Sequence, residues 1–146
     1  RSIKAERVAM DDTRRALRQK KKLIKQFESR QDSDDWQAKL DEIIKAADEK
    51  QWTHAATLLD RMTAALDKSG READEAKELL DFVTEEWKIL RNQLEAAMIK
   101  ADDKERLQCE ASVAKAGEEL SVGNVESCLE NLSAADDLME KLRRRI

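Results

Sequence analysis

The sequence predicts an all-α protein, an elongated helical bundle of about six helices. The main evidence is a run of apolar residues spaced 3,4,3,4 through 73–101, which places them on one face of a helix. The second observation is charge, because 41% of all residues are Asp, Glu, Lys or Arg. So much charge can indicate disorder, but a disordered chain has no reason to keep an apolar seam. The charged residues are therefore expected to cover solvent-exposed helix faces.

The strongest helical pattern covers 73–101 and extends over about four heptads. The seam consists of Ala73, Ala76, Leu80, Val83, Trp87, Leu90, Leu94, Ala97 and Ala101. Leu79, Phe82, Ile89 and Met98 lie beside this seam and predict a wider apolar face, as in a bundle helix rather than a two-stranded coiled coil. We expect the rest of the chain to supply the helices that pack against it.

Residues 1–29 predict a first long helix with a thinner seam. Its apolar positions, at intervals of seven, are Ile3, Met10, Leu17 and Ile24. The intervening seam positions are polar (Glu6, Thr13 and Lys20), and Phe27 continues the apolar stripe. This helix is therefore short of apolar burial, and it is the element most in need of a partner or a second copy.

The second and third helices are expected to form a hairpin over 34–68. A polar break at 31–35 precedes it, where Asp32 or Ser33 can cap the next helix. The apolar register breaks near Lys50, which indicates a tight turn. The inward residues are expected to be Trp36, Leu40, Ile43, Ala47, Trp52, Ala55, Leu59, Met62 and Leu66.

Gly70 predicts the end of this hairpin, because glycine commonly ends a helix in the left-handed conformation. A long helix over 71–101 follows. Asp102 and Glu105 then match a capping box, in which the first residue caps the helix and the residue three positions later supports it. No strong helix breaker stands here, so a helix that continues toward Ala116 remains the alternative.

The last part of the chain predicts a second hairpin over 103–145, with its turn at 121–124. The chain would then consist of two helical triplets, 1–70 and 71–146, each a long helix followed by a hairpin. An internal repeat of about 70 residues would explain this order. Residues 51–68 align with 124–141 without gaps, but the identity is low and similar helices align by chance, so both interpretations stay open.

Few residues are suited to catalysis or metal binding. His54 is the only histidine, so a two-histidine zinc site cannot form, and a nucleophilic Ser or Cys would have only this one base. Cys109 and Cys128 form no CxxC pair. They would differ in height by about 10 Å in an antiparallel hairpin, too far for a disulfide. We expect buried free thiols, no catalytic residues, no metal site and no cofactor, and therefore no enzyme.

The basic segment 14–25 is the one local feature with functional content. Arg14, Arg18, Lys22 and Lys25 would line one face of a continuous helix. This face could balance the acidic remainder of the chain, contact an acidic protein, or contact the phosphates of nucleic acid or an anionic membrane. No aromatic residues are interleaved for base stacking, which counts against nucleic acid.

The sequence predicts a non-catalytic protein-protein interaction, scaffold or spacer module of a larger protein. Recognition would use a helix face: a partner helix would dock between the two triplets or on residues 1–29, or the chain would self-associate. Binding of nucleic acid or an anionic membrane through the basic face is the alternative. We name Arg14, Arg18, Lys22 and Lys25 as the candidate partner-binding residues.

Two cysteines without a spacing motif favour the cytoplasm or another reducing compartment. No apolar run approaches the roughly 18 residues of a membrane span, and no secretory signal is recognisable. The chain begins with Arg1 rather than Met. We therefore expect an excised fragment or a processed product, from which a targeting signal can be missing.

Overall fold

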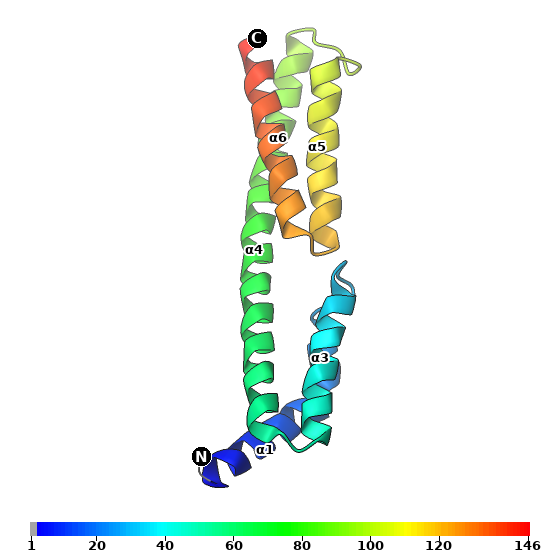
Figure 1. Ribbon diagram of the computed structural model, residues 1–146. Coiled ribbons are helices and arrows are strands. Elements are labelled where there is room, and N and C mark those ends of the chain that lie inside the picture. Colours follow the sequence, from blue (N-terminus) through cyan, green and yellow to red (C-terminus); the bar gives the residue numbers. More distant parts are fainter. Residues whose placement is uncertain (1–2) are drawn as a thin grey trace. The chain divides into compact units, whose positions relative to one another are not determined.

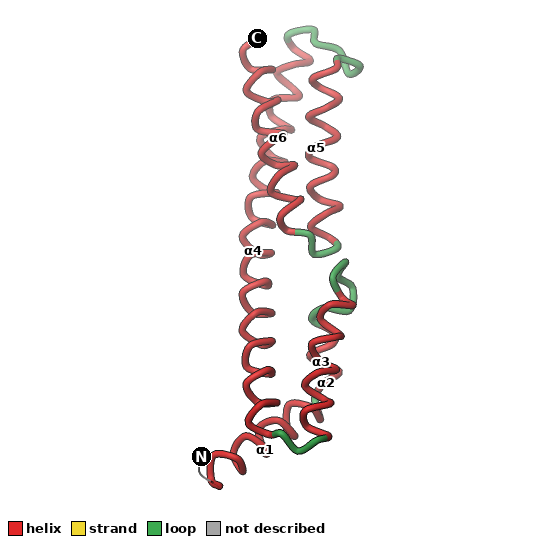
Figure 2. Tube along the Cα trace, viewed as in Figure 1, coloured by secondary structure: helices red, strands yellow, loops and turns green. Residues whose placement is uncertain are grey.

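The computed structural model describes residues 3–146 and confirms an all-α fold, with no strand in that range (Figure 1). The six helices are α1 (Ile3–Arg18), α2 (Lys20–Lys25), α3 (Ser33–Asp48), α4 (Trp52–Ala96), α5 (Lys104–Ser121) and α6 (Val125–Arg144). Loops and turns join them (Figure 2). The chain divides into two compact units, a first unit of residues 1–70 and a second unit of residues 71–146. Each unit has its own apolar core.

The core of the first unit is built by α2, α3, the first part of α4 and the turn after α2. Its buried side chains are Phe27, Trp36, Leu40, Ile43, Met62 and Leu66. Phe27 and Trp36 stack with their ring centroids 6.5 Å apart. The Trp36 indole donates a hydrogen bond to Asp32, which also pairs with Arg30. Lys50 takes a left-handed backbone conformation (φ 59°) in the predicted turn, and this reverses the chain between α3 and α4.

The prediction of one continuous helix over 1–29 is wrong, because the helix breaks at Gln19 and ends at Lys25. Like charges four residues apart, as in Arg14–Arg18 and Arg18–Lys22, weaken a continuous helix. Ile3, the first predicted seam position, is 80% exposed. Residues 1 and 2 of the predicted helix lie outside the described residues.

The prediction that Gly70 ends a helix is also wrong, because α4 continues through it for 45 residues. Gly70 does not adopt a positive φ angle, whereas Gly123 does. Ser69 occupies the seam position between Leu66 and Ala73, so the 3,4 register is unbroken across the glycine. One glycine costs about 1 kcal/mol relative to alanine, which helix cooperativity and packing on both sides exceed.

In the second unit α5 and α6 pack against the C-terminal part of α4 as a three-helix bundle (Figure 1). The buried core residues are Ala76, Val83, Trp87, Leu90, Leu94, Cys109, Ala116, Cys128, Leu132, Ala135, Met139 and Leu142. The Trp87 indole donates a hydrogen bond to Glu110 of α5. Ion pairs also join α6 and the turn after it to the rest of the second unit. Arg143 pairs with Glu86 of α4 (3.0 Å), and Arg145 pairs with Asp103 (2.8 Å).

The predicted break before α5 is confirmed, although α4 ends at Ala96 rather than at residue 101. Met98 reverses the backbone with a left-handed φ of 67°. The N-cap of α5 is Asp103, not Asp102, and its carboxylate accepts a hydrogen bond from the Arg106 amide at 3.2 Å. The buried Arg106 guanidinium donates to the Ile99 carbonyl at 3.0 Å, which fixes the connecting loop.

The residues that were predicted to widen the α4 seam are exposed instead. The exposed fractions are 41% for Leu79, 61% for Phe82, 59% for Ile89 and 82% for Met98. The first three lie beside the seam that packs against α5 and α6 rather than within it, and Met98 lies beyond the end of the helix. The fully buried residues of α4 in the second unit are therefore confined to the 3,4 seam.

Replacing Gly70 with alanine is expected to raise the free energy of unfolding by about 0.5–1 kcal/mol, because alanine restricts the unfolded chain more than glycine. A Cβ atom at Gly70 would meet no atom within 4 Å. Gly123→Ala is the contrasting variant and should destabilise the protein, because Gly123 has a φ of 82°. Urea unfolding of the two variants tests the direction of both changes in the free energy of unfolding. A Gly70→Ala variant that is less stable than wild type would contradict an unbroken α4.

Replacing Thr13 with valine is expected to stabilise the protein by about 1 kcal/mol, because it removes a buried hydroxyl that lacks a partner. Thr13 is fully buried (0% exposed), and its Oγ1 has no hydrogen-bond partner within residues 3–146. The matched control is Thr84→Val, because the Thr84 hydroxyl donates to the Leu80 carbonyl at 2.7 Å. Thermal unfolding should show a higher melting temperature for Thr13→Val only. Equal changes in the melting temperatures of the two variants would contradict the burial of an unsatisfied hydroxyl.

Asp103 should make stability depend on acid pH. The hydrogen bonds from the Arg145 side chain, and then the bond from the Arg106 amide, lower the pKa of Asp103 to about 2. A carboxylate with a lowered pKa in the folded state stabilises the protein above its ordinary pKa, and this contribution is lost as the pH falls toward 2. Asp103→Asn keeps an N-cap side chain but removes the charge.

We therefore expect Asp103→Asn to be less stable than wild type at neutral pH, with a difference that shrinks as the pH falls from about 4 to about 2. Asp102→Asn is the control, because Asp102 is exposed and does not cap α5. Melting temperatures measured across this pH range test the expectation. A pH-independent difference would contradict it.

Candidate functional site

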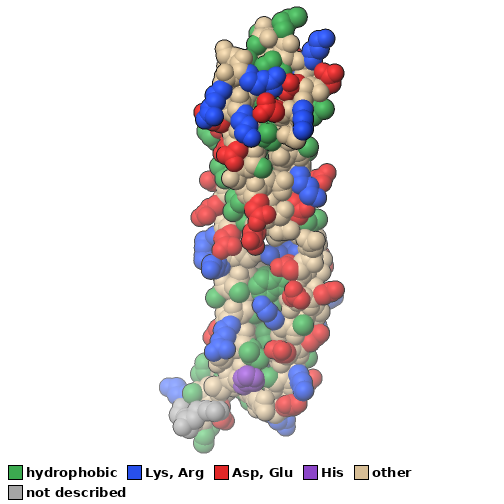
Figure 3. Space-filling view, turned by 45° about the horizontal axis from the view of Figure 1, so that its top comes forward, with side chains coloured by type: hydrophobic (Ala, Val, Ile, Leu, Met, Phe, Trp, Pro, Cys, Tyr) green, Lys and Arg blue, Asp and Glu red, His purple; other side chains and the backbone are tan. Residues whose placement is uncertain are grey.

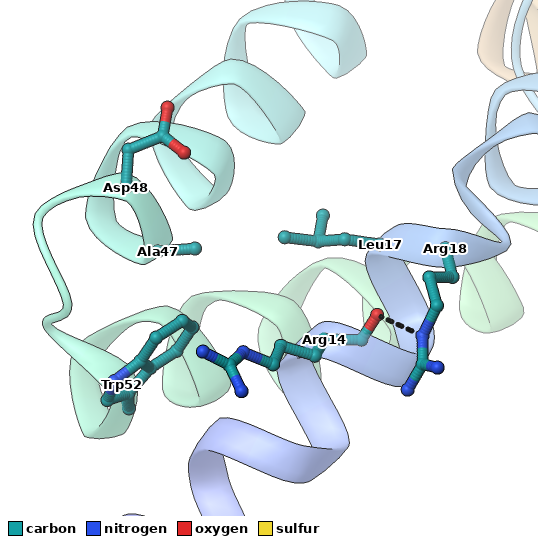
Figure 4. Close-up of a pocket in the computed structure, with 6 residues that line it drawn as sticks. All are labelled: Arg14, Leu17, Arg18, Ala47, Asp48 and Trp52. Carbon is teal, nitrogen blue, oxygen red and sulfur yellow. Dashed lines mark hydrogen bonds between the residues drawn. The ribbon is translucent and has the colours of Figure 1, made fainter.

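The break at Gln19 distributes the four predicted partner-binding cations over different surfaces. Arg14 and Arg18 line one pocket, together with Leu17, Ala47, Asp48 and Trp52 (Figure 4). Lys22 lies at a second pocket, whose other lining residues come mainly from α4. Lys25 is exposed and lines neither of these pockets. The structure therefore brings two of the four residues together.

The first pocket, which we call the Arg14 pocket, is open and has a volume of about 560 Å³. The Arg14 side chain extends toward Trp52, and its guanidinium carbon lies 5.1 Å from the centre of the ring (Figure 4). A cation in this position is attracted by the electrons of the aromatic face. Leu17 and Ala47 face each other across the pocket and supply apolar surface (Figure 4).

Local sequence explains why the Arg14 pocket forms. The left-handed turn at Lys50 places Trp52 at the start of α4, close to the end of α3. Ala46, Ala47 and Ala55 form a small buried cluster of short side chains. Short side chains let neighbouring helices approach closely, and Leu17 of α1 and Trp52 pack against this cluster. Trp52 was predicted to point inward, but it is only half-buried and forms a wall of the pocket.

The charges of Arg14 and Arg18 are not neutralised within the described chain. Neither guanidinium forms an ion pair with a carboxylate of residues 3–146. Arg18 donates a hydrogen bond through its Nε to the Arg14 carbonyl at 3.4 Å. Asp48 lines the same pocket, but its carboxylate points away from both guanidiniums (Figure 4). No ion pair with a carboxylate of the described residues therefore balances these two cations.

The pocket at Lys22 has a different character. It has a volume of about 530 Å³ and includes two carboxylates, Asp60 and Asp67, together with polar and apolar side chains. A positive charge (Lys22) and two negative charges (Asp60 and Asp67) share this surface, so it does not select for a negative ligand. Charged side chains of both signs are also dispersed over the face of the molecule that Figure 3 shows. Among the four candidate residues, Arg14 and Arg18 thus form the more distinctive site.

The other chemically reactive side chains do not form a site with them. His54 is exposed, as predicted, and is the purple side chain in Figure 3. Cys109 and Cys128 are buried free thiols, as predicted. Burial, with a contribution from the negative charges of Glu110 and Asp136, raises the pKa of Cys109 to about 12. Burial also raises the pKa of Cys128, so both remain thiols at neutral pH.

The described residues contain no group of three or more His, Cys, Asp or Glu side chains that could hold a metal ion. None of the helices within residues 3–146 combines the length and the apolar character that crossing a membrane requires. The chain was compared with protein-family models, with curated proteins and with solved structures, and none of the three comparisons gave a match.

Proposed function

We propose that the chain is a non-catalytic helical module that binds another protein, and that the Arg14 pocket receives acidic side chains of this partner. The observation that carries the proposal is the pair of guanidiniums, Arg14 and Arg18, which lack a carboxylate partner within residues 3–146 and line one pocket, with Arg14 beside Trp52. Arginine binds carboxylates through two parallel hydrogen bonds, which gives both affinity and orientation.

The surroundings of the two arginines support a protein partner. Arginine and tryptophan are the residues most enriched among those that dominate the energy of protein interfaces. Leu17 and Ala47 add apolar surface, against which the aliphatic part of a glutamate or a neighbouring side chain can pack. A volume of about 560 Å³ accommodates a few side chains rather than a folded domain.

Nucleic acid or an anionic membrane is the alternative ligand of the basic face. A phosphate polymer or a lipid surface is best matched by a continuous row of cations. The break at Gln19 separates Lys22 from the Arg14 pocket, and Asp60 and Asp67 lie beside Lys22. This separation favours a compact acidic group over an extended polyanion.

The experiment compares Arg14→Ala/Arg18→Ala with Lys21→Ala/Lys25→Ala, a control that removes the same charge from exposed positions outside the pocket. The probes are a fluorescent helical peptide rich in Glu and Leu, a short DNA duplex, and phosphatidylcholine vesicles with about 30% phosphatidylserine. We expect the arginine variant to bind the peptide about tenfold more weakly, because charged hydrogen bonds are lost. The lysine control should change peptide binding less than about twofold.

The salt dependence separates the ligand classes. The proposal would be contradicted if the protein bound DNA or vesicles more tightly than the peptide, if this binding fell steeply with salt, and if both double variants weakened it equally. Peptide binding that is the same in both double variants would also contradict it. Circular dichroism of each variant establishes that the helices remain folded.

A further inference from the structure

In the second unit α4 carries a row of three apolar residues and Glu86 that α5 and α6 leave partly exposed. Leu79, Phe82, Glu86 and Ile89 are spaced 3,4,3 and therefore lie along one side of the helix. The apolar members are 41%, 61% and 59% exposed, respectively. From the first to the last, the row spans ten residues of helix, or about 15 Å. We call these four residues the α4 stripe.

An ion pair connects the α4 stripe to α6. Arg143 of α6 binds Glu86 with an Nη2–Oε2 distance of 3.0 Å. Asp136 and Glu140 precede Arg143 by seven and three residues, so they lie on the same face of α6. Glu140 is also paired with Arg143, at 3.9 Å. One arginine therefore serves the carboxylates of both helices at this surface.

The balance of charge around the α4 stripe is negative. Glu86, Asp136 and Glu140 lie near Arg143, and Glu140 is also paired with Arg144 at 4.0 Å. Glu75 and Glu78 add two exposed carboxylates one turn before Leu79 and Phe82, respectively, so the carboxylates outnumber these two cations. Burial and the neighbouring charge of Glu86 both raise the pKa of Asp136, although Arg143 opposes this. A cation brought to this surface would relieve the repulsion between these carboxylates.

We propose that the α4 stripe binds an amphipathic helix of another protein whose apolar seam is bordered by lysine or arginine. Leu79, Phe82 and Ile89 would pack against the seam of the partner, and Glu86, Asp136 and Glu140 would face its cations. A second copy of the same surface is a poor occupant, because it would place carboxylates opposite carboxylates.

This inference does not depend on the proposed function of the Arg14 pocket. The α4 stripe and the α6 carboxylates belong to the second unit, whereas Arg14, Arg18 and Trp52 belong to the first. The two surfaces also select ligands of opposite charge. Arg14→Ala/Arg18→Ala should therefore leave binding at the α4 stripe unchanged, so the failure of one proposal is distinguishable from the failure of the other.

The test measures binding of two fluorescent helical peptides of about 18 residues, which share a leucine seam and differ in having lysine or glutamate borders. Phe82→Glu is compared with Leu107→Glu, a control at a 53% exposed position on α5 that adds the same charge. We expect wild type to bind the lysine peptide at least about tenfold more tightly than the glutamate peptide. Phe82→Glu should weaken binding of the lysine peptide by at least about tenfold, and Leu107→Glu should weaken it by less than about twofold.

The added glutamate makes the outcome decisive. If the lysine peptide were held only by general negative charge, both glutamate variants would bind it equally or more tightly, and that result would overturn the proposal. Ile89→Glu serves as a second variant if Phe82→Glu loses its helical circular dichroism. Sedimentation velocity that reveals a self-associated wild type dissociated by either stripe variant would also overturn it, because the occupant would then be a second copy.

Discussion

The apolar seam of α4 is the constraint on which the rest of the structure depends. Met62 and Leu66 of this helix are buried in the core of the first unit, and Val83, Trp87 and Leu90 are buried in the core of the second. Each core therefore combines side chains of α4 with side chains of the other helices of its unit. Both cores thus draw on a single continuous helix, Trp52–Ala96.

Polar interactions then fix the ends and connections that the seam leaves undefined. Arg145 fastens the end of α6 to Asp103, the N-cap of α5, and Arg106 holds the loop that precedes α5 through the Ile99 carbonyl. In the first unit Arg30 binds Asp32 and also donates to Ser69 of α4 at 2.6 Å. Buried or partly buried pairs of this kind specify geometry more than they add stability. They explain why the connections have defined conformations in a chain whose surface is mostly charged.

The two surfaces that we assign to partners arise from what this architecture leaves unsatisfied. On α1, Arg14 and Arg18 have no carboxylate partner within the described residues, and on α4 the row from Leu79 to Ile89 has no covering helix. Opposite charge preferences at two surfaces are consistent with a module that connects different proteins. In both cases recognition would be by side chains displayed on helices, without any chemical change of the partner.

The sequence by itself determined the helical class, the turn at Lys50, the break before α5 and most buried positions of the seams, because apolar periodicity and capping residues act over a few neighbouring residues. It misplaced the helix end at Gly70, where a local propensity was outweighed by the register that Ser69 preserves between Leu66 and Ala73. Only the tertiary structure decided that Leu79, Phe82 and Ile89 are exposed and that Arg14 meets Trp52. Exposure depends on which side of a helix its neighbours cover, and a pocket depends on side chains that are distant in the sequence.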